Sequence, residues 1–404
     1  MVVVKQSSSN MGKFLFLLII FIAVGQMTQT MYVPAIPEMA TFFGVRAASL
    51  QAVMAAYLIP YGLSQFVYGP LSDRIGRRPV MISGMVIFLI GTVIALVAPS
   101  FDVLLLASFI QGMGTGTSGA MSRTVTRDCY DGDDLHKVNS LVSMGVIFSP
   151  LIAPVLGGYL SEHLGWESIY IFLLGFGALV TLALMRSFGE TLPVENRRAE
   201  RVWVSYRYVL SNRRFQGYVV CLIATFAGVA TFEASAGVLL GSVLKLDPST
   251  VSWLFIVPLP GYLLGSWGSN KLMKRLGTNR VLFLGMFALL TGAITIIIPG
   301  MEGLVTVTSL IGGAFIYFIG AGVLFPAATT LAIQPFPHHA GTAGAVLGGL
   351  QNLGAGLATL AASAMSAQSQ FNLGAVLSVM AIIVVLSLVW IRRSEKNDIT
   401  ILAS

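Results

Sequence analysis

Charged residues are scarce in this chain. Only 10% of its 404 residues are Asp, Glu, Lys or Arg, whereas 55% are hydrophobic. Mean hydropathy is +0.82. This balance excludes an ordinary soluble globular domain. Apolar runs of roughly 20 residues, each long enough to cross a bilayer core of about 30 Å, recur along the whole sequence. We therefore expect an all-α membrane protein.

Groups that usually carry chemistry are also missing. The two cysteines are placed by the sequence in a polar loop (Cys129) and in an apolar span (Cys221), so no disulfide is expected. No Cys/His cluster has metal-ligand spacing, and the adjacent His338 and His339 are interpreted as solvated. The absence of a G-x-x-x-x-G-K-[ST] motif excludes ATP hydrolysis by the P-loop route. We expect no cofactor and no enzyme activity, with energy drawn from a proton gradient rather than from an ATPase subunit.

The apolar pattern predicts twelve membrane spans. They lie near residues 14–33, 48–70, 79–98, 103–122, 138–160, 168–186, 216–240, 249–270, 281–299, 304–326, 341–364 and 372–391. The first span follows two lysines, as in a signal peptide. Its apolar run is too long for that, and no small-residue cleavage site follows, so we expect it to remain in the mature protein.

The distribution of basic residues predicts the orientation. With both termini in the cytoplasm, Arg46 and Lys245 fall outside and the other 22 of the 24 Lys and Arg fall inside. This bias follows the positive-inside rule. The net charge of +7 is then a signature of topology, and we expect no nucleic-acid partner.

One long polar stretch, residues 187–214, divides the chain. It separates a six-span half (1–186) from a second six-span half (215–391), and a tail follows at 392–404. Apolar residues recur within the stretch at helical spacing, opposite arginines: Val202, Trp203, Tyr206, Val209 and Leu210. We interpret this pattern as a helix in the cytoplasmic interface, and a disordered charged linker is the alternative.

The two halves show a degenerate repeat. A shift of 201 positions places Gly277 on Gly76, and the basic loop 274–280 on residues 73–79. Lys274 then stands where the first copy has Asp73. This correspondence predicts two pseudo-symmetric halves with a binding site between them near the membrane midplane.

The first copy of this loop has the composition of a gate. Its candidate residues are Gly69, Asp73, Arg74, Gly76, Arg77 and Arg78. Glycines permit tight turns and close helix approach, and a carboxylate at Asp73 can accept from helix-terminal amides and pair with arginine. Such a latch would bias a rocking equilibrium between two states. In the alternative interpretation, the arginines merely enforce topology.

The fifth span combines small residues with prolines. Gly145, Ser149, Ala153 and Gly157 recur at intervals of four and form a smooth stripe against which a helix can pack. Pro150 and Pro154 bend the span, and Gly158 extends the small-residue stretch.

Glu233 is the one acidic residue that lies well inside a predicted span. Burial of a carboxylate in the membrane is expensive and usually functional. Because removal from water favours the neutral form, we expect Glu233 to gain and lose a proton or to contact a cationic substrate. A structural role for a protonated, hydrogen-bonded Glu233 is the alternative.

Other polar or aromatic residues inside the spans must face protein or water, because lipid offers them no partner. With Glu233, they form the candidate substrate-binding set: Gln26, Thr30, Tyr57, Tyr61, Gln65, Gln111, Gln351 and Asn352.

Several of these stretches resemble a known family. Residues 69–79 resemble the G-x-L-a-D-r-x-G-r-r loop of major facilitator transporters, and residues 153–158 (APVLGG) resemble their G-P-x-x-G-G antiporter motif, with Ala153 for the first Gly. Stretches that include Gln29–Ile36, Gln111–Gly116 and Phe232–Ala234 are similar to the Bcr/CflA group of drug:proton antiporters. The resemblance spans essentially the whole chain.

The resemblance implies a monomeric multi-pass protein of the bacterial inner membrane. Such a protein exports lipophilic drugs in exchange for protons by alternating access. Thr30 and Ser108 stand where many relatives carry an acidic residue and an arginine, which leaves Glu233 as the candidate for proton coupling. A proton-coupled symporter that imports a small metabolite, and a membrane protein that binds a ligand without transport, are the alternatives.

Overall fold

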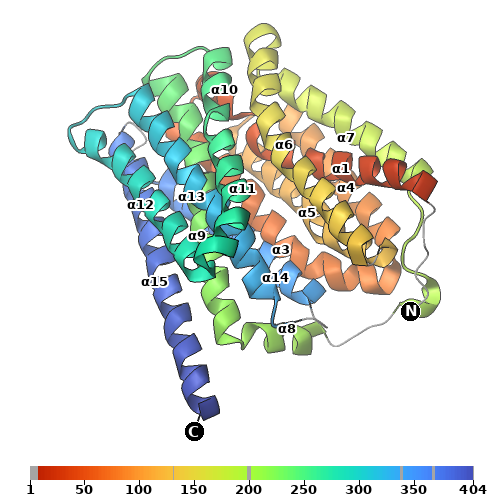
Figure 1. The fold of residues 1–404 in the computed structure, drawn as a ribbon. Coiled ribbons are helices and arrows are strands. Elements are labelled where there is room, and N and C mark those ends of the chain that lie inside the picture. Colours follow the sequence, from red (N-terminus) through yellow and green to blue (C-terminus); the bar gives the residue numbers. More distant parts are fainter. Residues whose placement is uncertain (1–7, 131, 198–201, 337–339, 366–368, 404) are drawn as a thin grey trace.

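The computed structural model describes residues 8–130, 132–197, 202–336, 340–365 and 369–403, and all regular structure in these ranges is helical (Figure 1). The elements before residue 200 are α1 (Ser8–Thr30), a 3₁₀ turn (Val33–Ala35), α2 (Ile36–Phe43), a 3₁₀ turn (Ala47–Leu50), α3 (Gln51–Ile75), α4 (Arg77–Leu96), α5 (Phe101–Cys129), α6 (Gly132–Leu164), α7 (Glu167–Ser187) and a 3₁₀ turn (Val194–Asn196).

The remaining elements follow the same pattern of long helices. They are α8 (Val202–Leu210), α9 (Arg213–Ala236), a π-helix (Gly237–Val243), α10 (Pro248–Ile256), α11 (Pro258–Leu276), α12 (Thr278–Met301), α13 (Val307–Ile333), α14 (Ala340–Ser363) and α15 (Gln370–Ala403). The short α8 lies at the bottom of Figure 1, across the end of the bundle, and α10 lies at the top. We call these two ends the α8 end and the α10 end.

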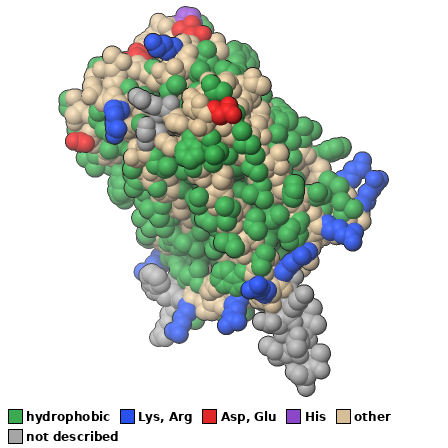
Figure 2. Space-filling view, turned by 90° about the vertical axis from the view of Figure 1, so that its left-hand side faces the viewer, with side chains coloured by type: hydrophobic (Ala, Val, Ile, Leu, Met, Phe, Trp, Pro, Cys, Tyr) green, Lys and Arg blue, Asp and Glu red, His purple; other side chains and the backbone are tan. Residues whose placement is uncertain are grey.

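Ten helical segments among the described residues are long and apolar enough to cross a membrane. The long helices α5 and α6 lie among them in the bundle but are not counted with them (Figure 1). Figure 2 shows a broad hydrophobic surface, with Lys and Arg gathered toward the α8 end and acidic side chains toward the α10 end. The prediction of an all-α membrane protein is confirmed, and the count of twelve spans stays a prediction.

The structure differs from the sequence analysis at a proline and at the end of a helix. The predicted span 249–270 is divided into α10 and α11 at Val257, because Pro258 supplies no N–H to continue the helix. The expected loop position of Cys129 is wrong: this residue is the last of α5 and is buried.

The repeat seen in the sequence has a structural counterpart at two glycines. Gly76 separates α3 from α4 with φ 105°, and Gly277 separates α11 from α12 with φ 82°. Backbone in this left-handed region strains L side chains but not glycine. The matching glycines therefore let both loops turn within one residue.

Candidate functional site

Glu233 lies on α9, where it is buried and faces α1. Gln29 Nε2 donates a hydrogen bond to Glu233 Oε2 over 3.2 Å, which joins a helix of the first half to one of the second. No ion pair among the described residues involves Glu233. Burial of a carboxylate without a cationic partner is costly inside a membrane, which makes Glu233 a candidate functional residue. Its role in proton coupling stays a prediction. The sequence analysis did not predict that Gln29 bonds Glu233, because no sequence pattern indicates that these two residues are close.

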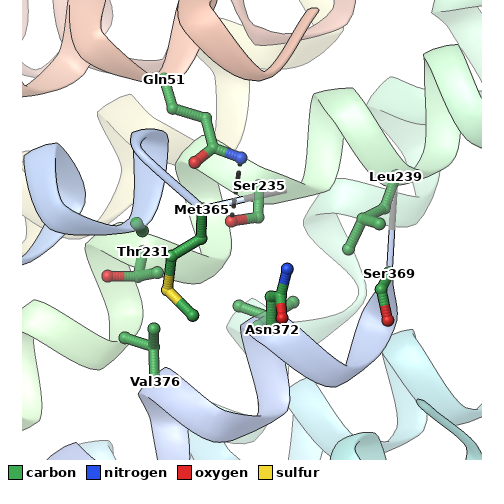
Figure 3. Close-up of a pocket in the computed structure, with 10 residues that line it drawn as sticks. Gln51, Thr231, Ser235, Leu239, Met365, Ser369, Asn372 and Val376 are labelled. Carbon is green, nitrogen blue, oxygen red and sulfur yellow. Dashed lines mark hydrogen bonds between the residues drawn. The ribbon is translucent and has the colours of Figure 1, made fainter. Parts of the chain in front are cut away.

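A small pocket lined by polar and apolar side chains lies beside α9 (Figure 3). Ser235 accepts a hydrogen bond from Gln51 Nε2 over 3.4 Å, and Thr231 and Ser369 also line the pocket. Its volume is about 20 Å³, which is room for about one water molecule. Gln51 Oε1 is buried without a hydrogen-bond partner in the described part of the chain. The pocket is too small for a drug-sized ligand.

The proline-rich part of α6 meets α10 across the two halves. Ser252 Oγ donates to the carbonyl oxygen of Pro154 over 2.8 Å. An added Cβ would lie 1.9 Å from the Met31 carbonyl oxygen at Gly157, and 2.0 Å from Ser252 Oγ at Gly158. Glycine is therefore required for this close approach.

The other two members of the predicted antiporter motif lie elsewhere on α6. Pro150 is partly buried, and the surroundings of Gly145 fall outside the described residues. The role of this motif in antiport stays a prediction.

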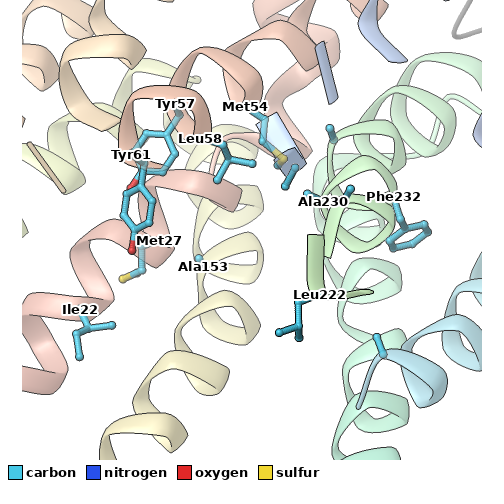
Figure 4. Close-up of a cluster of buried hydrophobic side chains, with 14 of the residues drawn as sticks. Ile22, Met27, Met54, Tyr57, Leu58, Tyr61, Ala153, Leu222, Ala230 and Phe232 are labelled. Carbon is cyan, nitrogen blue, oxygen red and sulfur yellow. The ribbon is translucent and has the colours of Figure 1, made fainter. Parts of the chain in front are cut away.

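Two tyrosines of the candidate substrate set lie together on α3, near Met27 and Met54 (Figure 4). The rings of Tyr57 and Tyr61 are 5.8 Å apart and stacked. The Tyr57 hydroxyl lies 2.7 Å from both the Gly25 carbonyl oxygen and Thr115 Oγ1, so it ties α3 to α1 and α5. Figure 4 shows Leu222 and Phe232 on the other side of this apolar cluster.

The remaining polar candidates do not converge on one point. Gln111 donates to Thr92 Oγ1 over 2.9 Å, so its amide is engaged with α4. Asn352 donates to the Gly348 carbonyl within α14, and Thr30 donates to Gln26 within α1. Gln65 and Gln351 are buried, whereas Gln26 is partly exposed. Their assignment to substrate binding stays a prediction.

The gating loop forms a network of charges at the α8 end. Arg77 is buried, and it pairs with Asp73 over 2.5 Å and with Asp128 over 2.9 Å. It also donates to Ser72 Oγ. The two carboxylates compensate the charge of the buried guanidinium group. The sequence analysis identified Asp73 as the partner and missed Asp128.

Glu190 is a second residue that the sequence analysis missed. Its carboxylate accepts from the backbone N–H of Arg77 over 2.8 Å and from that of Arg78 over 3.3 Å. These amides belong to the first turn of α4, where a negative charge is favourable. Arg78 also donates to the Met185 carbonyl.

Arg74 and Gly69 are less engaged than expected. The Arg74 side chain is exposed. At Gly69 an added Cβ would meet no heavy atom within 4 Å, so the expected close helix approach does not occur there. Of the two loop glycines, only Gly76 has a positive φ, which a residue with a side chain adopts with strain.

Tyr206 of α8 lies beside this network and lines the same cavity as Asp73 and Arg77. Its hydroxyl donates to the Phe66 carbonyl over 3.2 Å, and its ring packs edge-on against the Phe66 ring. Burial and the nearby Asp73 raise the pKa of Tyr206 to about 12, so the hydroxyl keeps its proton. The predicted helix forms as α8 and packs through its tyrosine, while Val204, Tyr208 and Leu210 are exposed. Its place in the cytoplasmic interface stays a prediction.

The comparisons with known proteins agree with this architecture. A family model described as Major Facilitator Superfamily matches residues 17–359 and, again, residues 234–402. In fold, the chain is similar to the xylose transporter XylE of E. coli in a partially occluded inward-open conformation, with a TM-score of 0.75 and 13% identity over 96% of this chain and 98% of that one. The chain belongs to the Major Facilitator Superfamily and is a transporter rather than an enzyme.

Among its relatives, the chain is 44% identical to Multidrug resistance protein D of Escherichia coli (strain K12), over 92% of this chain and 94% of the relative. It is 27% identical to a Chloramphenicol resistance protein of Pseudomonas aeruginosa, over 79% of this chain and 77% of that protein. These relatives confirm the resemblance found in the sequence motifs.

Proposed function

We propose that the protein is a proton-coupled multidrug efflux transporter that exports hydrophobic or amphipathic compounds by alternating access. The observation that carries the proposal is Glu233, a buried carboxylate without a cationic partner among the described residues, bonded to Gln29 between the two halves. The names of the relatives support the drug class. The apolar cluster beside Tyr57 and Tyr61 is buried in this conformation and has the chemistry that such compounds need.

In the proposed cycle, the proton and the drug compete through Glu233. Deprotonated Glu233 favours a drug in the cavity that faces the cytoplasm, and protonation accompanies drug release on the outside. The two ligands are then coupled reciprocally, because each changes the affinity for the other. The network around Asp73 and Arg77 holds α3, α4 and α5 together as one unit while the two halves move.

The proposal includes the topology. Twelve spans, made of α5 and α6 with the ten apolar segments, place both termini in the cytoplasm of a bacterial inner-membrane protein. The α8 end then faces the cytoplasm, which is consistent with its concentration of Lys and Arg. A monomer suffices, because both halves of the site come from one chain.

Purified protein in liposomes tests the function. With an imposed proton gradient and an internal pH dye, addition of a lipophilic cation such as ethidium should release protons, and empty liposomes should not respond. Glu233→Gln should abolish this drug-driven proton movement while the protein still inserts and folds. Glu38→Gln is the matched control, because Glu38 is an acidic residue of α2 at the α10 end and bonds Ser161 instead.

Coupling at the wild-type level in Glu233→Gln would contradict the role of Glu233. If no drug moves protons, and a nutrient moves them in the direction of its own uptake, import would replace efflux as the proposed function.

A further inference from the structure

A cavity of about 250 Å³ lies at the α8 end between the two halves. On the side of the first half it is lined by the Asp73–Arg77 network and by Arg123 and Arg127 of α5. On the side of the second half it is lined by the first turns of α14, including Thr342 and Gly344. Its volume is several times the roughly 30 Å³ that a water molecule occupies in the liquid.

The arginines that line this cavity differ in whether a carboxylate pairs with them. Arg77 is shared by two carboxylates, Asp73 and Asp128. Arg123 and Arg127 lie one helical turn apart on α5, and neither makes an ion pair within the described ranges. Arg123 Nη1 donates to the Gly344 carbonyl oxygen over 2.8 Å, which is a neutral acceptor. The cavity lining therefore holds three arginines and two aspartates, and both aspartates are engaged by Arg77.

The opposite wall adds to this positive potential. The N–H groups in the first turn of α14 have no acceptor within the helix, and they form its positive end. No acidic residue lies in that turn. A Cβ at Gly341 would be 3.3 Å from Arg127 Nη1, and a Cβ at Gly344 would be 3.5 Å from Arg123 Nη1. Two arginines of one half thus lie beside the positive end of a helix from the other, and an anion between them would reduce their mutual repulsion.

We propose that this cavity binds a phosphate-bearing anion, which bridges Arg123 and Arg127 of α5 to the first turn of α14. The planar guanidinium group suits the paired oxygens of a phosphate, and helix N-terminal amides supply further donors. The same chemistry is found in an anionic phospholipid headgroup and in free phosphate. A bound anion would hold the two halves together at the α8 end and stabilise the conformation described here.

Thermal unfolding of the purified full-length protein tests the site and does not depend on transport. Protein in nanodiscs of pure phosphatidylcholine is titrated with inorganic phosphate against chloride at matched ionic strength. In parallel, nanodiscs with increasing phosphatidylglycerol are compared at constant salt. A rise in the unfolding temperature with phosphate identifies the free anion, and a rise with phosphatidylglycerol alone identifies the headgroup.

Variants assign the effect to the cavity. Arg123→Gln and Arg127→Gln should each weaken the apparent affinity for the stabilising anion at least tenfold, and Arg123→Lys should keep part of it because the charge remains. Arg207→Gln removes one positive charge from the exposed face of α8 and should leave the affinity unchanged. The proposal is overturned if neither anion stabilises the wild-type protein, or if both glutamine variants respond as the wild type does.

Discussion

Replacement of Arg77 should expose how strongly the gating loop is held. Arg77→Gln leaves Asp128 without its partner, and the side chain of Asp128 is only 15% exposed, so most of the loss is that of a buried pair. Removal of one partner of a buried pair costs about 3–5 kcal/mol. The Asp73 side chain is 49% exposed, so solvent screening limits the contribution of the Arg77–Asp73 pair to about 1 kcal/mol or less. We therefore expect Arg77→Gln to lower the free energy of unfolding by about 3 kcal/mol.

A double-mutant cycle separates the two carboxylates. Unfolding free energies are measured in mixed micelles by titration with a denaturing detergent, for Arg77→Gln, Asp73→Asn, Asp128→Asn and the two double variants. The coupling of Arg77 to Asp128 should exceed its coupling to Asp73. Loss of less than about 0.5 kcal/mol in Arg77→Gln, a value typical of surface substitutions, would refute the reasoning, as would a stronger coupling to Asp73.

Three further outcomes follow from named contacts. Gly157→Ala should destabilise the protein by about 1–3 kcal/mol, because the added Cβ would meet the Met31 carbonyl. Gly175→Ala on α7, where a Cβ meets nothing within 4 Å, is the matched control, and equal unfolding temperatures of the two variants would contradict the close approach. Tyr57→Phe should cost about 1 kcal/mol in detergent unfolding by removing the hydroxyl between Gly25 and Thr115, and an unchanged stability would mean that this bond contributes nothing. In a Cys221→Ser background, alkylation of Cys129 should be slow in the folded protein and fast after unfolding, because the thiol is buried at the end of α5. Equal labelling rates in the folded and unfolded protein would contradict this burial.

The sequence predicted the features that depend on composition and on backbone sterics. Apolar runs located the long helices, because a span must be apolar along its whole length. The helices α5, α13 and α15 continue past the predicted ends at 122, 326 and 391 to Cys129, Ile333 and Ala403. The correspondence of Gly76 and Gly277 was visible in the sequence, because both positions need a left-handed φ that glycine tolerates. The division of the eighth span at Val257 could also have been expected from Pro258.

The partners of the site residues could not be predicted in the same way. Gln29 and Glu233 are 204 positions apart, and Asp128 and Arg77 are 51 apart, so each pair depends on how whole helices pack. Gln111 shows the opposite error: an intramembrane amide suggests a cavity, yet it is engaged by Thr92 of the neighbouring helix. Composition identifies which side chains need a partner inside the membrane, and packing alone decides which partner each one finds.

The two ends of the bundle are held by different physics. The charged contacts of the gating loop join Asp73, Arg77 and Asp128, all within the first half, so in this conformation the network fastens α3, α4 and α5 to one another. Across the halves, the α8 end carries the hydrogen bond from Arg123 to Gly344, whereas the α10 end carries the neutral contact of Ser252 with Pro154 and a hydrogen bond from Ser249 to the Glu162 carboxylate. Because salt screens charges and leaves neutral packing nearly unaffected, ionic strength should act most strongly at the α8 end, where the arginines gather. We therefore expect the gating loop to act by keeping one half rigid, and the balance between the two ends to be set by the few contacts that cross between the halves.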